Sequence, residues 1–138
     1  MSDLREHPQA IDTAIEEFLR MESSNQLGNR RAARDTALGG VDIAAGTYVH
    51  ICIGAANRDP DQFPDPDRLD IRRTPNRHLA FATGIHACAG MSLARMEAQV
   101  AIGRLLQRFT SIERSGPFVR GGRARFRGFG SYPVRIGA

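Results

Sequence analysis

Residues 81–90 read Phe81-Ala82-Thr83-Gly84-Ile85-His86-Ala87-Cys88-Ala89-Gly90, and no other stretch says more about the fold. Glycines flank the cysteine, and the segment leads into a predicted helix over about residues 89–109. Free N–H groups and the positive dipole end at a helix start stabilise a thiolate. Glycine lets the backbone approach a bulky flat partner or adopt a positive φ. We therefore predict that the loop presents Cys88 as a metal-ligating thiolate.

Other roles for Cys88 are weaker. A structural cysteine is the default for an isolated residue, but it does not explain a glycine loop around the sulfur. A zinc site needs about four protein ligands, and His86 and Cys88 have no second cluster to join. A Cys–His hydrolase would need the imidazole to reach a thiol two positions away in the same loop. A metal that brings its other ligands with it, as haem iron does, fits best.

The pattern Phe-x-x-Gly-x-His-x-Cys-x-Gly over residues 81–90 resembles the haem-binding signature of the cytochrome P450 family in its soluble bacterial form. Glu17-Phe18-Leu19-Arg20 is similar to that family's Glu-x-x-Arg motif, on the helix at the proximal side of the haem. Residues 56–60 and 63–70 resemble its meander. With Leu4 at one end and the tail at residues 127–134, the resemblance covers nearly the whole chain.

Glu17 and Arg20 also form a plausible pair on physical grounds alone. At i, i+3 on a helix they lie on one face. Arg73 falls where the family has the arginine that completes a triad with this pair. A buried carboxylate between two guanidinium groups would be compensated by bidentate hydrogen bonds. We expect these three residues to support the structure and not to act as catalysts.

The resemblance implies haem b (iron-protoporphyrin IX), with Cys88 as the axial ligand of the iron. Three cationic or donor residues match positions that bind the haem propionates, and three others belong to the cofactor loop. They are Arg30, His78 and His86, and then Phe81, Gly84 and Gly90. Strand alternation points Arg30 and its neighbour Arg31 to opposite faces, and this leaves the choice between them open.

Periodicity and turn residues predict the remaining elements. Apolar residues recur with helical spacing from Pro8 to about Met21–Ser24. Residues 29–53 favour strands, with turns at Gly39-Gly40 and Ala45-Gly46, and Cys52 is expected in the core. Three prolines exclude regular structure from residues 56–77, and residues 118–136 predict two short strands. The expected fold is mainly α with small β-sheets (α+β), the C-terminal proximal half of the P450 fold, as one partial domain over residues 1–138.

Composition narrows the class of protein further. The 138 residues are 41% hydrophobic and 25% charged, as is ordinary for a globular domain. No apolar run approaches the roughly 18–20 residues of a membrane-spanning helix, and the N-terminus lacks the apolar core of a signal peptide. Two cysteines are too few for a disulfide scaffold, so we expect a cytoplasmic protein.

All 19 basic residues are arginine, and the net charge is +4. The tail after Ser111 contains many arginines interleaved with aromatic residues, a composition that is also found in nucleic-acid-binding proteins. No helix-turn-helix, zinc or RNA-sheet signature accompanies them, so we do not expect nucleic acid as a partner. The charge also suits an acidic redox partner.

The function implied by the resemblance is O₂-dependent monooxygenation of a small organic substrate, with electrons from a ferredoxin- or flavodoxin-type donor. The family's acid–alcohol pair on a distal helix has no counterpart, because Asp12-Thr13 lies in the proximal helix. Ser24 replaces a usual proline, and Ala82-Thr83 stands where glycine is common. We therefore expect a fragment or truncated member, inactive alone, that needs a further N-terminal portion or oligomerisation. The alternative is a non-catalytic haem-binding or interaction module.

Overall fold

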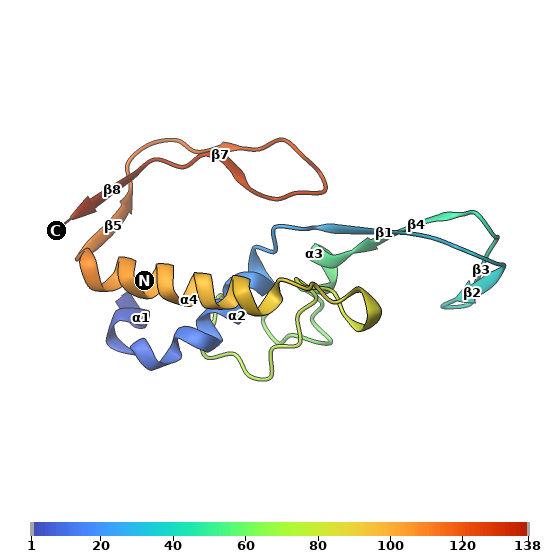
Figure 1. Ribbon diagram of the computed structural model, residues 1–138, viewed down its shortest axis with the longest axis horizontal. Helices are drawn as coiled ribbons and strands as arrows, with labels where there is room; N and C mark the ends of the chain where they lie inside the picture. Colours follow the sequence, from blue (N-terminus) through green and yellow to red (C-terminus); the bar gives the residue numbers. More distant parts are fainter. Residues whose placement is uncertain (1, 138) are drawn as a thin grey trace.

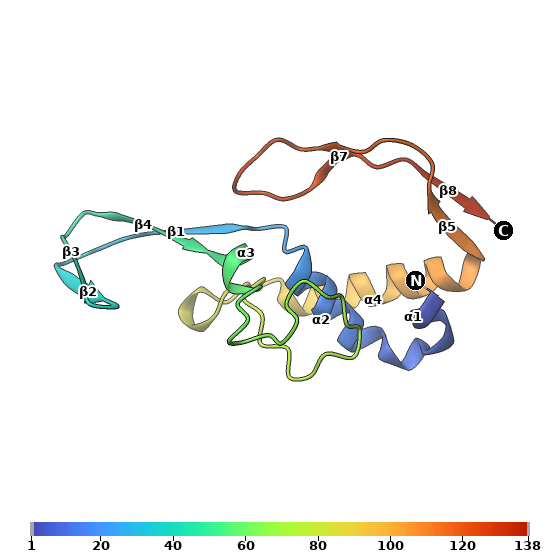
Figure 2. The ribbon, with the colours of Figure 1, turned by 180° about the vertical axis from the view of Figure 1, so that it is seen from behind.

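A computed structural model describes residues 2–137 and shows a small helical body with two long β arms (Figure 1). The body contains α1 (Ser2–Glu6), the 3₁₀ turn η1 (Pro8–Ala10), α2 (Ile11–Met21) and α4 (Met91–Arg108). Coil residues 57–83 wrap beneath α2 and α4, and the view from behind shows the same arrangement (Figure 2). The predicted helices and the predicted coil are thus confirmed, and α1 is an addition.

The first arm is built from two antiparallel pairs. β1 (Leu27–Arg31) pairs with β4 (Tyr48–Cys52), and β2 (Thr36–Leu38) pairs with β3 (Val41–Ile43) at the tip. The predicted turn at Gly39-Gly40 joins β2 to β3, and both glycines have a positive φ. The strand predicted to reach Ile53 ends one residue earlier, because Ile53 begins the short helix α3 (Ile53–Ala56).

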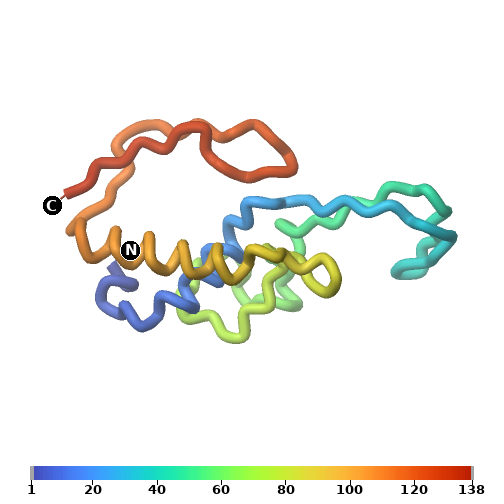
Figure 3. The backbone as a smooth tube through the Cα atoms, in the orientation of Figure 1, coloured from blue at the N-terminus to red at the C-terminus, as the bar shows by residue number. Residues whose placement is uncertain are grey.

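The second arm follows α4 and returns over it, as the backbone path shows (Figure 3). β5 (Ser111–Arg114) pairs with β8 (Val134–Gly137), and β6 (Val119–Arg120) pairs with β7 (Phe129–Ser131). The β6–β7 pair confirms the two strands predicted in the tail. The strand at residues 111–114 was not predicted.

The core lies between α1, α2, α4 and the coil. Its buried cluster consists of one residue from each of these segments: Leu4, Ala14, Ile71 and Leu106. The apolar stripe predicted on α4 is mostly exposed, since Leu93, Met96 and Val100 are each about half accessible. Cys52 is also exposed, so its predicted place in the core is wrong. Both errors arise because periodicity finds an apolar face but not what covers it.

Within residues 2–137 there is no helix with the length and apolar character needed to cross a membrane.

Candidate functional site

The loop that carries Cys88 is closed by backbone hydrogen bonds. The Cys88 N–H donates to the Phe81 carbonyl at 2.9 Å, and the Met91 N–H donates to the Cys88 carbonyl at 3.2 Å. Gly84 has a φ of 60° and begins the 3₁₀ turn η2 (Gly84–His86). These contacts fold residues 81–90 back on themselves and deliver the cysteine to the start of α4.

Cys88 is a free, exposed cysteine three residues before the first residue of α4. No side chain caps the start of α4, and its first turn contains no acidic residue that would repel a thiolate at Cys88. A Cβ built on Gly90 would lie 4.0 Å from the Cys88 Sγ, which is ordinary contact, so the sulfur is not crowded. The thiol is thus accessible and immediately precedes the end of α4 at which the helix dipole is positive.

The part of the chain that the structure describes holds no group of three or more His, Cys, Asp or Glu side chains that could bind a metal ion. A metal bound by Cys88 must therefore bring most of its ligands with it, as the iron of a porphyrin does. Zinc, which the sequence disfavoured, has no protein ligand set among residues 2–137.

Arg30 is half-buried on β1 and lines a cavity of about 360 Å³ with Ala82 and Thr83 of the cysteine loop. Its Nη1 donates to the neighbouring Asn29 carbonyl at 2.9 Å, and it has no carboxylate partner among residues 2–137. The side-chain oxygen of Asn25, on the same cavity, is buried without a hydrogen-bond partner. Among the described residues, the cavity thus holds a guanidinium group without a carboxylate partner and an amide oxygen without a hydrogen-bond donor.

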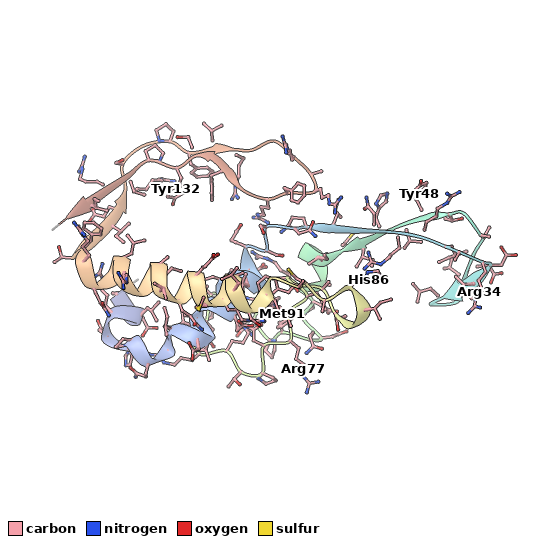
Figure 4. The ribbon with its side chains drawn as sticks, viewed as in Figure 1. Arg34, Tyr48, Arg77, His86, Met91 and Tyr132 are labelled. Carbon is pink, nitrogen blue, oxygen red and sulfur yellow. The ribbon has the colours of Figure 1, made fainter. Side chains whose placement is uncertain are left out.

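His86 is exposed in η2, and Figure 4 shows it in the loop just before α4, not far along the chain from Met91. Arg77 lies lower, on the coil segment that precedes the loop. Tyr48 and Arg34 lie out along the first arm, and Tyr132 lies on the second arm. Of the labelled residues, His86 and Met91 alone belong to the loop and the helix that follows it.

His78 contacts protein groups through both of its ring nitrogens. Its side chain is 3% exposed, and its Nε2 lies 3.1 Å from the Glu16 Oε2. The Ala80 N–H donates to its Nδ1 at 3.2 Å, so the Nε2–H is the donor to Glu16. Burial lowers the pKa of His78, although Glu16 acts in the opposite direction. These contacts occupy both ring nitrogens, and the propionate role of His78 stays a prediction.

Glu17, Arg20 and Arg73 meet as predicted. The side chains of Glu17 and Arg20 are fully buried, and Arg20 Nε donates to Glu17 Oε2 at 2.8 Å. Arg73 Nε lies 3.2 Å from the same oxygen. Burial by itself would raise the pKa of Glu17, but hydrogen bonds from Arg20, the Asp70 N–H and Arg73 outweigh it and lower the pKa.

This buried cluster fastens the coil to α2. Arg20 Nη1 donates to the carbonyls of Asn57 and Pro66, both at 2.8 Å, and Arg73 Nη1 donates to the Pro64 carbonyl at 2.7 Å. Asn57, which is fully buried, accepts the Leu79 N–H on its Oδ1 at 2.7 Å. A chain of contacts therefore runs from α2 through the coil to the segment that begins the cysteine loop.

Sequence reasoning missed four polar residues in these networks: Glu16, Asn57, Asn76 and Arg95. Asn76 Nδ2 donates to Glu17 Oε2 at 3.1 Å, and Arg95 pairs with Glu16 across 79 positions of sequence. Helical spacing could not reveal partners so far apart in sequence. Asn57 alone had a signal, since it lies in the segment that resembles the family's meander.

The residues present fit a porphyrin. An accessible cysteine precedes a helix, a half-buried arginine without a carboxylate partner lies beside it, and no competing ligand set exists in residues 2–137. The arrangement fits the class of haem proteins with a cysteine thiolate ligand.

Comparison with known proteins agrees. The family model for cytochrome P450 matches residues 1–117. The biotin biosynthesis cytochrome P450 of Bacillus subtilis (strain 168) is 53% identical over 109 residues, which are 79% of this chain and 28% of that protein. Cytochrome P450 107B1 of Saccharopolyspora erythraea is 46% identical over 143 residues, covering 100% of this chain and 35% of that protein. The chain therefore belongs to the cytochrome P450 family, whose members bind haem b.

Solved structures show the same fold. P450BioI, in complex with an acyl carrier protein ligated to hexadec-9Z-enoic acid, matches with a TM-score of 0.94 and 46% identity, over 97% of this chain and 35% of that chain. CYP109E1 from Bacillus megaterium in complex with testosterone matches with a TM-score of 0.96 and 32% identity, over 99% and 39%. The chain spans about a third of the length of these relatives.

Proposed function

We propose that this chain forms the proximal side of the haem site of a P450 monooxygenase, with Cys88 as the axial ligand. The observation that carries the proposal is an exposed thiol before an uncapped helix start, held by the hydrogen bond from its own N–H to the Phe81 carbonyl. When bound, the haem would supply the activation of O₂ for oxidation of an organic substrate. The protein would supply the thiolate, its orientation and the charge around it.

Arg30 and His86 are the residues that we assign to the propionates. Arg30 is half-buried and free of carboxylates among residues 2–137, so a propionate would give its guanidinium a partner. His86 is exposed two residues before Cys88 and can donate a hydrogen bond from its ring. His78 stays the third residue predicted for the propionates, and its ring nitrogens contact Glu16 and the Ala80 N–H.

Phe81, Gly84 and Gly90 shape the loop in this proposal. The Phe81 carbonyl accepts the Cys88 N–H, Gly84 supplies the positive φ, and Gly90 is the N-cap residue that joins the loop to α4. Glu17, Arg20 and Arg73 are supports that fix the coil against α2. A bound thiolate needs such a rigid frame, since its direction towards the metal is set by the backbone that carries it.

Turnover would need an electron donor of the ferredoxin or flavodoxin type and a small organic substrate. The arginine-only basic complement supports an acidic donor. The half-exposed Leu93, Met96 and Val100 on α4 support a requirement for further polypeptide over this helix.

The test is the absorbance spectrum of the haem-reconstituted, reduced and CO-treated protein. We expect the red-shifted Soret band of a thiolate ligand in the wild type and its loss in Cys88→Ala. Cys52→Ala is the matched control, because Cys52 is the other free and exposed cysteine. A band that survives in Cys88→Ala, or that disappears in Cys52→Ala, contradicts the proposal.

A further inference from the structure

Glu16 connects three segments that are far apart in sequence. It lies on α2, and its carboxylate accepts two hydrogen bonds from Arg95 on α4, from Nε at 2.7 Å and from Nη2 at 2.8 Å. The same carboxylate accepts the Nε2–H of His78, on the coil before the cysteine loop, at 3.1 Å. Bidentate pairing of this kind fixes direction as well as distance.

The two partners of Glu16 both lie against Phe81. The Arg95 Cζ is 4.9 Å from the centroid of the Phe81 ring, within the range of a cation–π contact. The His78 ring centroid is 6.4 Å from the same ring, tilted by 56°. Glu16 itself does not need to touch Phe81, because it sets the position of the two groups that do.

Phe81 in turn holds Cys88, since its carbonyl accepts the Cys88 N–H at 2.9 Å. We propose that Glu16 is a positioning residue for the cysteine loop, acting through Arg95 and His78 on Phe81 and so on the backbone of Cys88. This inference rests on the proposed haem-thiolate function for its purpose, but not for its geometry.

The burial of the partners shows why the carboxylate matters. His78 is 3% exposed, so without Glu16 its Nε2–H would have neither protein nor water as an acceptor. Arg95 is 32% exposed, and without Glu16 its guanidinium could turn towards solvent and leave the Phe81 ring. Loss of Glu16 should therefore loosen both contacts of Phe81 at once.

The charged groups around Glu16 favour its ionised form. The hydrogen bond from Arg95 is the largest influence and lowers the pKa of Glu16, while partial burial opposes it. The pKa of Arg95 is raised by the same contact. His78 faces Glu16, Arg95 and Arg20, and its lowered pKa, due first to burial, keeps the ring neutral. The network therefore consists of an ionised Glu16, a charged Arg95 and a neutral His78 that donates a hydrogen bond.

The test uses hydrogen exchange of single backbone amides in the 138-residue chain without haem. We expect Glu16→Gln to speed exchange of the Cys88 amide about tenfold, because the charge that holds Arg95 is lost. The Asp70 amide, which donates to Glu17 at 3.0 Å, is the internal reference and should not change. Glu97→Gln on α4 is the control variant, since Glu97 is exposed and has no ion pair among residues 2–137.

Arg95→Gln provides a second route to the same answer. Glu16 and Arg95 act in one path, so the double variant should exchange at Cys88 no faster than the faster single variant. Faster exchange at Cys88 alone supports the proposal. No change at Cys88, or an equal increase at Asp70, overturns it.

Rescue by the conservative variant gives a readout that a general loss of stability would not move. Glu16→Asp keeps the negative charge that pairs with Arg95, so we expect slower exchange at Cys88 in Glu16→Asp than in Glu16→Gln. Failure of the haem spectrum would leave this measurement readable, because it does not use haem. Equal exchange at Cys88 in the two variants would count against the positioning role.

Discussion

The Glu17 cluster and the Cys88 loop are neighbouring regions with opposite character. In the cluster, a fully buried carboxylate accepts hydrogen bonds from Arg20, Arg73, Asn76 and the Asp70 amide. In the loop, the cysteine is exposed and its sulfur has no partner in the part of the chain that the structure describes. The first region is satisfied by the protein itself, whereas the second presents a group for something else to bind.

This difference separates stability from binding. Removing one partner from a buried ion pair leaves an uncompensated charge and is costly. Removing an exposed group costs little stability but removes what the group could bind. Glu16 connects the two regions. It lies on the same helix as Glu17, but its carboxylate contacts Arg95 and His78, which lie beside the loop.

The largest expected effect comes from breaking the buried cluster. Glu17→Ala leaves Arg20 fully buried without its carboxylate and should lower the free energy of unfolding by about 3–5 kcal/mol. Denaturant titration followed by circular dichroism measures it. Glu97→Ala, at an exposed position on α4, should change stability by less than about 0.5 kcal/mol. Equal effects of the two substitutions would contradict the high cost of breaking the buried Glu17 cluster.

A smaller effect is expected from acid, because it acts through one histidine. The folded chain lowers the pKa of His78 from its ordinary 6.5, first through burial. The unfolded chain therefore binds the proton first, and stability should fall as the pH drops below about 6.5. Glu17, whose pKa is lowered from 4.5, adds its own loss only below that value. The free energy of unfolding should therefore be lower between pH 4.5 and 6.5 than above pH 6.5, and His78 alone should cause this difference.

His78→Gln is the control for this pH dependence. It removes the titrating ring, so the fall in stability between the two values should disappear. If the fall persists unchanged, another group is responsible.

The smallest expected effect has the opposite sign and lies in the loop. Ala82 has a φ of 55°, which is unfavourable for a residue with a Cβ. Ala82→Gly removes this strain and should raise the free energy of unfolding by about 0.5–1 kcal/mol, after the entropy of glycine in the unfolded chain is included. Ala87→Gly is the matched control, because Ala87 has a φ of −54° and should lose stability. A loss of stability in both variants would show that Ala82 is not strained.

Local patterns were enough to predict much of the fold. The i, i+3 spacing of Glu17 and Arg20 placed them on one helix face, and the structure buries both. The prolines of residues 56–77 excluded regular elements, and none forms there beyond α3 at Ala56. The two glycines at 39–40 predicted the turn between β2 and β3. Each of these features depends on residues that are close together in sequence, and a sequence pattern can therefore predict it.

The remaining features depend on which distant surfaces meet. Cys52 has the apolar neighbours of a core residue but lies exposed on an arm that no other segment of residues 2–137 covers at this position. The apolar residues of α4 have the spacing of a buried helix face. Within residues 2–137, however, Leu106 is the only one of them that is buried. Glu16 and Glu17 are the same residue type at neighbouring positions, so the sequence does not distinguish them. Because they point in different directions from α2, Glu16 pairs with Arg95 and Glu17 pairs with Arg20.

By itself, the sequence determined the two long helices, the absence of regular elements from the coil and the cysteine just before a helix, because short-range spacing and backbone preferences control them. Tertiary structure alone decided that His78 is turned to Glu16, that Arg95 covers Phe81 and that Arg30 shares a cavity with the cysteine loop. The physical reason is that burial and hydrogen-bond partnership belong to pairs of surfaces. Such pairs exist only once α2, α4 and the coil have packed together.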